Sequence, residues 1–225
     1  MAGRAARAAG GGLEPRNAPV QDRSRRSIAR ILEAAHEVLR RDGAEAATTI
    51  TIAAQAGVAV GSLYHYFPNK EAVILALYDE KLTALRAFTA GLRTAEGDWR
   101  DSLRTWILAI KRHELEIGFD FSLFEAVQHY ARLAEVAEDH AEGMAKALVM
   151  RLKQLGAIWS DAALYDLALN AFYLNASSWL YWRASGGYAQ RASDRLAAAV
   201  LAVVAPAMEG EAEPDGPHLA PRRAG

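Results

Sequence analysis

Residues 52–71 read IAAQAGVAVGSLYHYFPNKE, and this stretch decides the fold. Small residues occupy its first half, where two helices must cross closely, and Gly57 can take the left-handed backbone that a sharp helix end requires. The second half carries a serine, two tyrosines and a histidine on one short helical segment. Two short helices joined by a glycine turn predict a helix-turn-helix, whose second helix is presented to the DNA major groove.

Helix signals continue on both sides of this stretch. Before it, apolar residues at helical spacing predict one buried stripe that stops at Asp42-Gly43, a pair typical of helix ends. The residues of this stripe are Ile28, Ile31, Leu32, Ala35, Val38 and Leu39. Thr48 or Thr49 can cap the first short helix, and Asn69 can cap a longer helix over about residues 70–92.

The whole pattern resembles the DNA-binding signature of the TetR-type (tetracycline-repressor family) transcription regulators, over about residues 23–92. The resemblance is carried by Thr48-Thr49, Ile52-Ala53, Ala56-Gly57-Val58, Gly61-Ser62-Leu63-Tyr64, Tyr66-Phe67 and Pro68-Asn69-Lys70-Glu71. It implies an all-α protein, in which an N-terminal three-helix helix-turn-helix domain precedes a helical bundle for dimerisation and effector binding. The DNA contacts that it implies are Thr48, Thr49, Val60, Gly61, Tyr64, His65, Tyr66 and Lys70.

The side chains of the second short helix divide into an inner and an outer set. Leu63 and Phe67 lie four residues apart, so they face the same way and are expected to anchor this helix on its neighbours. On the outer side, tyrosine hydroxyls can donate to phosphates, His65 to a phosphate or a base, and Lys70 can meet a phosphate by charge. Two alternatives without a DNA contact stay open: Tyr66 is a core residue, and His65 is a surface histidine without a role.

Two places depart from the commoner pattern of this family. Serine is frequent at position 59, where it caps the recognition helix, but Ala59 has no side-chain acceptor to do so. A polar or basic residue is frequent at positions 50 and 51, which here hold Ile50 and Thr51. The loss of one phosphate contact leaves an alternative open, a helical ligand-binding protein with weakened or lost DNA binding.

Charge is divided unevenly along a chain whose net charge is −1. Residues 23–70 hold seven basic and four acidic side chains, a balance of +3, whereas residues 71–225 hold 16 and 21, a balance of −5. A basic first domain on an acidic body suits a protein that touches phosphates at one end. Arg25 and Arg26 crowd a helix start, where positive charge opposes the helix dipole, which favours a DNA phosphate partner over a merely solvated face.

Four segments are expected along the chain. They are a disordered tail over 1–22, the helix-turn-helix DNA-binding domain over 23–70, an effector-binding and dimerisation domain over 71–208, and a second disordered tail over 209–225. Within the body, five further helices are predicted at about 99–116, 121–134, 137–156, 161–185 and 193–206. No segment sustains the alternation that a half-buried strand requires, so no sheet is predicted.

The body is expected to hold a small-molecule effector site. Large rings with a few polar residues among them describe a mainly apolar ligand site, and they also describe any helical core, which is the simpler interpretation for each ring taken singly. The residues predicted to line the site are Trp106, Ile110, His113, Phe124, Gln128, Phe172, Asn175 and Trp179.

The last two predicted helices carry faces suited to a homodimer, which would match a near-palindromic DNA operator. The same faces can also pack within one subunit. On the first of these helices the face holds Leu167, Asn170, Leu174 and Ser178, and on the second Leu196, Ala199, Val200 and Val203.

Composition and missing motifs exclude other classes of protein. The chain has no cysteine, which excludes disulfides and thiolate metal sites. It has no nucleophile elbow, no HExxH metal motif and no phosphate-binding loop, so no enzyme, cofactor or metal is predicted. The longest apolar run, Leu196 to Met208, contains Pro206 and is too short to span a bilayer. The resemblance to TetR-type regulators implies a cytoplasmic repressor that a small, mainly apolar effector releases from its operator.

Overall fold

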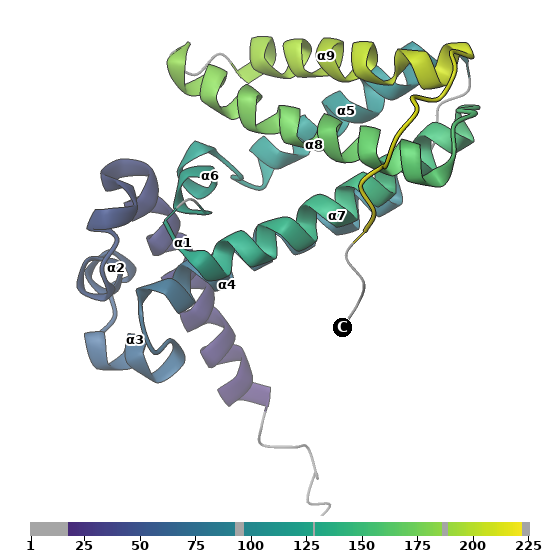
Figure 1. Ribbon diagram of the computed structural model, residues 1–225. Coiled ribbons are helices and arrows are strands. Elements are labelled where there is room, and N and C mark those ends of the chain that lie inside the picture. The colour runs from purple at the N-terminus through teal and green to yellow at the C-terminus, as the bar shows by residue number, and fades with distance from the viewer. Residues whose placement is uncertain (1–17, 93–96, 128, 186–188, 222–225) are drawn as a thin grey trace, which may run out of the picture.

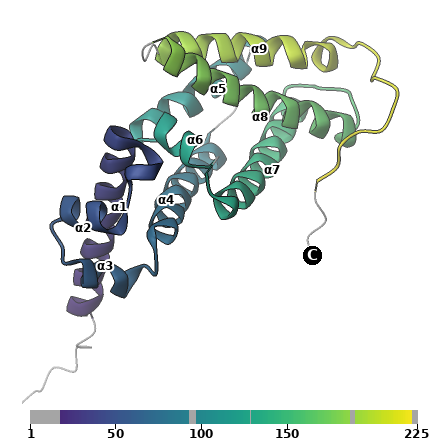
Figure 2. The same ribbon diagram turned by 60° about the vertical axis from the view of Figure 1, so that its left-hand side comes forward.

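The computed structural model describes residues 18–92, 97–127, 129–185 and 189–221, and every regular element in these ranges is a helix. This result confirms the all-α prediction. The helices are α1 (Ala18–Ala46), α2 (Thr49–Ala56), α3 (Val60–Tyr66), α4 (Lys70–Gly91), α5 (Trp99–Glu116), α6 (Phe121–Val127), α7 (Ala131–Gln154), α8 (Asp161–Ala184) and α9 (Ala189–Glu209). Helices α1–α3 form one end of the molecule and α8 and α9 the other, with α4 and α7 between them (Figures 1 and 2).

Helix α1 begins earlier and ends differently than the sequence predicts. It starts at Ala18, so residues 18–22 are helical rather than part of a disordered tail. At the predicted stop, Gly43 adopts a left-handed backbone with φ 82° and ψ 173°, and helical residues continue beyond this kink to Ala46. The glycine accounts for the kink because only glycine adopts such a backbone without steric strain.

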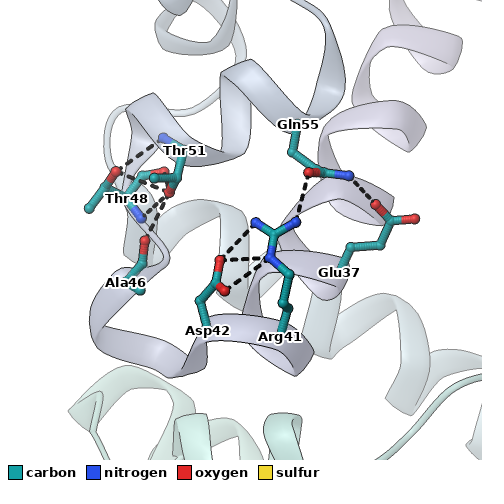
Figure 3. Close-up of polar contacts among 7 residues, drawn as sticks. All are labelled: Glu37, Arg41, Asp42, Ala46, Thr48, Thr51 and Gln55. Carbon is teal, nitrogen blue, oxygen red and sulfur yellow. Dashed lines mark hydrogen bonds and ion pairs between the residues drawn. The ribbon is translucent and has the colours of Figure 1, made fainter.

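Helix α2 is held on α1 by apolar burial on one side and by a polar network on the other. Ile52 and Ala53 are fully buried in the core that α1 contributes to. In the network, Arg41 Nη1 donates to Gln55 Oε1 at 3.3 Å, and Gln55 Nε2 donates to Glu37 Oε2 at 2.5 Å (Figure 3). Two residues of α1 thereby fix one residue near the end of α2.

Side-chain caps define where the short helices begin. Thr48, rather than Thr49, caps α2: its Oγ1 accepts from the N–H of Thr51 at 3.1 Å, and Thr51 Oγ1 accepts from the N–H of Thr48 at 2.9 Å (Figure 3). This reciprocal pair satisfies two backbone donors at once. As predicted, Asn69 caps α4, since its Oδ1 accepts from the N–H of Ala72 at 2.8 Å.

Helix α4 belongs to both hydrophobic cores. Its first half contributes fully buried residues, among them Ile74 and Leu77, to a core shared with α1–α3, α6 and the start of α7. Further along, Leu85 belongs to a second core built from α5 and α7–α9. The two cores therefore meet along a single continuous helix.

Several predicted boundaries in the body are wrong. Helix α6 ends at Val127 and α7 begins at Ala131, whereas the sequence predicts an end at 134 and a start at 137, so α6 is only seven residues long. Helix α9 extends three residues past Pro206, because a proline in the last turn removes a backbone donor without blocking the residues that follow. None of the described helices is both long and apolar enough to cross a membrane.

Residues 210–221 follow α9 and fold back onto the start of α8, where the sequence predicts a disordered tail (Figure 1). Trp159 Nε1 donates to the carbonyl oxygen of Glu211 at 2.9 Å. The Glu213 carboxylate accepts from both the N–H and the hydroxyl of Ser160, each at 2.7 Å. Because Ser160 is the N-cap of α8, a carboxylate here also complements the positive end of the helix dipole.

The faces predicted for dimerisation pack largely within the subunit. Leu167 and Leu174 are half-buried against the second core, and Ser178 is buried. On α9, Leu196 and Val200 are buried in the same core. This outcome matches the alternative that the sequence left open for these faces.

We expect Leu63→Ala to destabilise the N-terminal domain by about 2–5 kcal/mol, because Leu63 is the fully buried residue of a seven-residue helix and its loss leaves a cavity. Urea unfolding followed by circular dichroism would measure the change. Ser62→Ala, an exposed neighbour on the same helix, is the control and should shift stability by no more than about 0.5 kcal/mol. Equal effects of the two variants would contradict this packing.

Candidate DNA-binding surface and ligand chamber

The turn between α2 and α3 is fixed by Gly57 and by a residue of α1. Gly57 ends α2 with φ 63°, the left-handed conformation that the sequence predicts for it. Arg30 Nη2 donates to the carbonyl oxygen of Ala56 at 2.5 Å. This guanidinium places positive charge at the C-terminal end of α2, where the helix dipole is negative. The angle at which α3 leaves α2 is therefore set by the backbone and by α1 together.

Helix α3 presents a polar face on an apolar base, as the sequence predicts. Leu63 and Phe67 are buried in the core of the N-terminal domain. Tyr64 and His65 are exposed, and Tyr66 is half-buried with its ring packed against that core. The rings of His65 and Tyr66 meet edge to face, with a centroid distance of 5.1 Å and an angle of 74° between the planes. Tyr66 therefore has a core contact of its own, whereas Tyr64 and His65 face solvent.

Thr48 and Thr49, both predicted to contact DNA, differ in the hydrogen-bond partners of their hydroxyl groups. Thr49 Oγ1 and the hydroxyl of Tyr64 lie 3.1 Å apart, so a residue of α2 and a residue of α3 form one hydrogen-bonded pair at the surface. The Thr48 hydroxyl is engaged in the cap of α2 with Thr51. The sequence alone presents position 51 only as a place where a phosphate contact is lost. In the structure, Thr51 has a role in this cap.

The departures at positions 50 and 59 are visible in the structure. Ile50 exposes 67% of its side chain on the first turn of α2. Ala59 is the N-cap of α3 and makes no side-chain hydrogen bond to the helix. The first turn of α3 consequently has backbone N–H groups that no residue-59 side chain satisfies, and a phosphate can accept from such groups.

The predicted cationic contacts lie at the two ends of this surface. Arg25 and Arg26 are exposed on the first described turns of α1. Lys70, the first residue of α4, is half-buried, and its ammonium lies 5.8 Å from the ring centroid of Tyr130 in the body. The remaining predicted contacts, Val60 and Gly61, begin α3, with Val60 half-buried and Gly61 exposed.

Two adjoining cavities lie inside the body, with volumes of about 280 and about 70 Å³. Both are bounded by Glu114, His140, Phe172 and Asn175, and we call the two together the ligand chamber. Six residues predicted for the effector site line it: Trp106 and Ile110 the smaller cavity, Phe124 and Trp179 the larger, and Phe172 and Asn175 both. Gln128 lies outside the described residues.

His113 does not line the chamber. Its ring stacks on Phe88 of α4, with a centroid distance of 4.0 Å and an angle of 18° between the planes. Helical position explains the difference, since His113 follows the inward-facing Ile110 by three residues and Glu114 takes the inward position one residue later.

A buried ion pair that the sequence did not reveal forms part of the chamber wall. Lys111 Nζ is paired with Glu114 Oε2, donates to Asn175 Oδ1 at 2.9 Å and lies 4.0 Å from the ring centroid of Trp179. Its signal in the sequence was positional: Ile107, Lys111 and Glu114 follow the spacing of the buried face of α5. Charges on such a face are almost always paired.

His140 of α7 is the second polar group that sequence reasoning missed. Its side chain is buried, and burial lowers the pKa of its imidazole to about 4, with a smaller contribution from the charge of Arg86. The His140 Nδ1 atom has no hydrogen-bond partner among the described residues. Its place in the stripe with Leu133, Ala137 and Met144 was the signal that could have shown it.

Comparisons with known proteins agree with this geometry. The signature of the bacterial regulatory proteins of the tetR family matches residues 31–77. The fatty acid metabolism regulator protein of Bacillus subtilis (strain 168) is 44% identical over 52 residues, which cover 23% of this chain and 27% of that protein. The match to this relative therefore spans about a quarter of the relative's length.

Solved structures match over most of the chain. A TetR-family transcriptional regulator from Streptomyces coelicolor has a TM-score of 0.60 at 22% identity, covering 80% of this chain and 99% of that one. A transcriptional regulator from Rhodococcus sp. Rha1 has a TM-score of 0.61 at 19% identity, covering 78% and 96%. At these identities the likeness concerns the fold. Residues 31–77 therefore carry the signature of the bacterial regulatory proteins of the tetR family, and the described helices share the fold of these solved structures.

Proposed function

We propose that the protein is a cytoplasmic transcription repressor, which binds a near-palindromic DNA operator as a homodimer and is released by a small, mainly apolar effector. The observation that carries this proposal is the exposed polar face of α3 on its buried base of Leu63 and Phe67. Such a helix offers hydroxyl and imidazole donors to a groove while its scaffold stays fixed.

Gly61 adds support for a nucleic-acid partner. Its φ is not positive, and a Cβ added to it would meet no atom within 4 Å, so nothing described in the protein requires a glycine there. Glycine inside a helix is less favourable than alanine by about 1 kcal/mol. A DNA backbone that approaches α3 closely explains why this position lacks a side chain.

The proposed dimer uses the outer faces of α8 and α9, which pack against each other within the subunit. Exposed residues recur at helical spacing on both: Asn170, Tyr173, Ser177, Leu180 and Ala184 on α8, and Arg191, Arg195, Ala198 and Ala202 on α9. Tyr173 and Leu180 are 54% and 51% exposed, and both are large apolar residues of this exposed face. Two such faces related by a two-fold axis would place both α3 helices on one DNA duplex.

Effector and DNA are proposed to be coupled through α4 and through a contact between α6 and α1. Phe119 lines the larger cavity and touches Tyr78 of α4, with a centroid distance of 5.7 Å. The next residue, Asp120, lies 3.2 Å from His36 Nε2 and 3.5 Å from Arg40 Nε on α1. Burial opposes its ionisation, but hydrogen bonds led by the one from His36 hold the pKa of Asp120 below its ordinary value. A ligand that displaces Phe119 would thus move a charged anchor of the DNA-binding domain.

We expect Gly61→Leu to weaken binding to an operator, selected from random DNA, by about tenfold or more, the equivalent of ~1.4 kcal/mol. The added side chain would hold the DNA backbone away from α3 without disturbing the fold. Fluorescence anisotropy with labelled operator measures the effect. Gly143→Leu is the matched control, because Gly143 is an exposed helical glycine on α7 with equally open surroundings. If both variants bind like wild type, α3 does not approach DNA in this way.

We expect Lys70→Ala and His65→Ala to change DNA binding in different ways. Lys70→Ala should weaken all DNA sequences alike and reduce the slope of log K against log salt by about 1, since it removes one phosphate contact. His65→Ala should mainly relax the preference for particular bases. Titrations of operator and scrambled DNA at several salt concentrations distinguish the two, with Lys153→Ala on the body as a charge-matched control. Salt-independent binding by wild type would favour the alternative of a ligand-binding protein without DNA function.

Asp120→Asn tests the coupling. The asparagine keeps the shape of the side chain but loses the charge that faces His36 and Arg40. For an effector found by a thermal-shift screen of apolar compounds, wild type should bind less tightly when operator is present, and linkage requires the reverse effect to be equal. In the variant, the ratio of the effector affinities measured without and with operator should approach one. Asp79→Asn, on the surface of α4, should keep the wild-type ratio. Equal effector affinities with and without operator in wild type would rule out direct coupling.

A further inference from the structure

The ligand chamber is apolar except for a few polar groups, and most of these already satisfy one another. Lys111 is paired with Glu114 and donates to Asn175 Oδ1. The same Asn175 oxygen lies 3.0 Å from the hydroxyl of Ser178, which also donates to the Asn175 carbonyl oxygen at 2.8 Å. Because every charge in this cluster has a partner inside the protein, the cluster itself does not call for a charged ligand.

His140 is different, because it is buried without a partner for one of its ring nitrogens. Its side chain is 6% exposed, it bounds both cavities, and its Nδ1 atom makes no hydrogen bond to any described residue. A buried polar atom left unsatisfied costs about 1–3 kcal/mol, so native structures rarely keep one without a reason. A group on a bound ligand is the partner that the position of His140 allows.

The chemistry of that ligand group follows from the state of the imidazole. Burial lowers the pKa of His140 to about 4, so the ring is neutral at physiological pH and offers one donor and one acceptor. A hydroxyl can donate to the ring nitrogen or accept from it, so it fits whichever tautomer is present. A carboxylate fits only one tautomer and brings a charge into an apolar space.

The charges around the larger cavity also disfavour an anion. Its wall includes the carboxylates of Glu114 and Glu138, and Lys111, which lines the smaller cavity, is already paired with Glu114. A further negative charge would be placed beside these two carboxylates, which is costly in a medium of low dielectric. An uncharged ligand avoids this cost.

Rings line the larger cavity on several sides. Phe119, Phe124, Phe172 and Trp179 all contribute to its wall, and its volume is about 280 Å³. Aromatic side chains stack or meet edge to face with other rings, which favours a flat ligand of one or two fused rings over a long flexible chain.

We propose that the ligand chamber selects an uncharged aromatic molecule bearing a hydroxyl group, which exchanges a hydrogen bond with His140 Nδ1. The proposal rests on the proposed function only in treating the chamber as the effector site. It concerns binding to the free protein, so it can be tested without DNA.

The test compares four probes of one size on the full-length chain: 2-naphthol, 2-methylnaphthalene, 2-naphthoate and 2-naphthylammonium. Binding is followed by quenching of tryptophan fluorescence, since Trp106 and Trp179 line the chamber. In wild type, 2-naphthol should bind about tenfold more tightly than 2-methylnaphthalene, the advantage expected from satisfying a buried polar atom. In His140→Leu this advantage should disappear, while 2-methylnaphthalene binds as well as before or better.

Two further variants keep the result interpretable. His113→Leu changes a histidine of α5 outside the chamber and should retain the full preference for 2-naphthol. His140→Gln restores a neutral donor and acceptor at position 140 and should recover part of the preference even if His140→Leu folds poorly.

The proposal is overturned if 2-naphthoate or 2-naphthylammonium binds best, if the preference for 2-naphthol survives His140→Leu, or if none of the probes binds wild type. These outcomes are separable from a failure of the proposed function. A protein that ignores DNA at low salt but shows the His140-dependent preference would keep the ligand assignment and lose the regulatory one.

Discussion

The arrangement of this protein depends on α4, one helix whose apolar residues are shared between two hydrophobic cores. Ile74 and Leu77 bury in the core of the N-terminal domain, while Leu85 buries in the core of the body. Close-packed interiors do not deform continuously, so neither end of this helix can shift without repacking the side chains around it. The position of the short helix α3, which follows from α1, α2 and the start of α4, is therefore tied to the packing of the body.

The N-terminal domain could be predicted well from the sequence because its signals are local. Gly57, Asn69, Leu63 and Phe67 each act through their own backbone conformation, cap or helical face, and the structure places all four as expected. The choice between Thr48 and Thr49 as the cap could not be settled in this way, since it depends on the reciprocal hydroxyl of Thr51.

The body was harder to predict because its determinants are distant in the chain. No glycine or proline lies between the end of α6 at Val127 and the start of α7 at Ala131 to mark the change of helix. The fold-back of residues 210–221 depends on Ser160 and Trp159, which lie some fifty residues earlier. All four aromatic residues predicted for the ligand site line the chamber, whereas of the predicted polar residues Asn175 lines it and His113 does not. Lys111 and His140 occupy positions on buried helix faces, but only their neighbours in three dimensions show which of their atoms are paired and which are not.

The open space beside Gly61 has a consequence for attempts to engineer this protein. Alanine would strengthen α3 and meets no steric obstacle in the protein itself. A laboratory selection for heat resistance would therefore favour replacing the glycine, and it would do so at the proposed expense of recognition. Under the contact proposed for Gly61, stability and DNA binding compete at this position, so variants of this residue selected for thermostability would bind an operator less tightly.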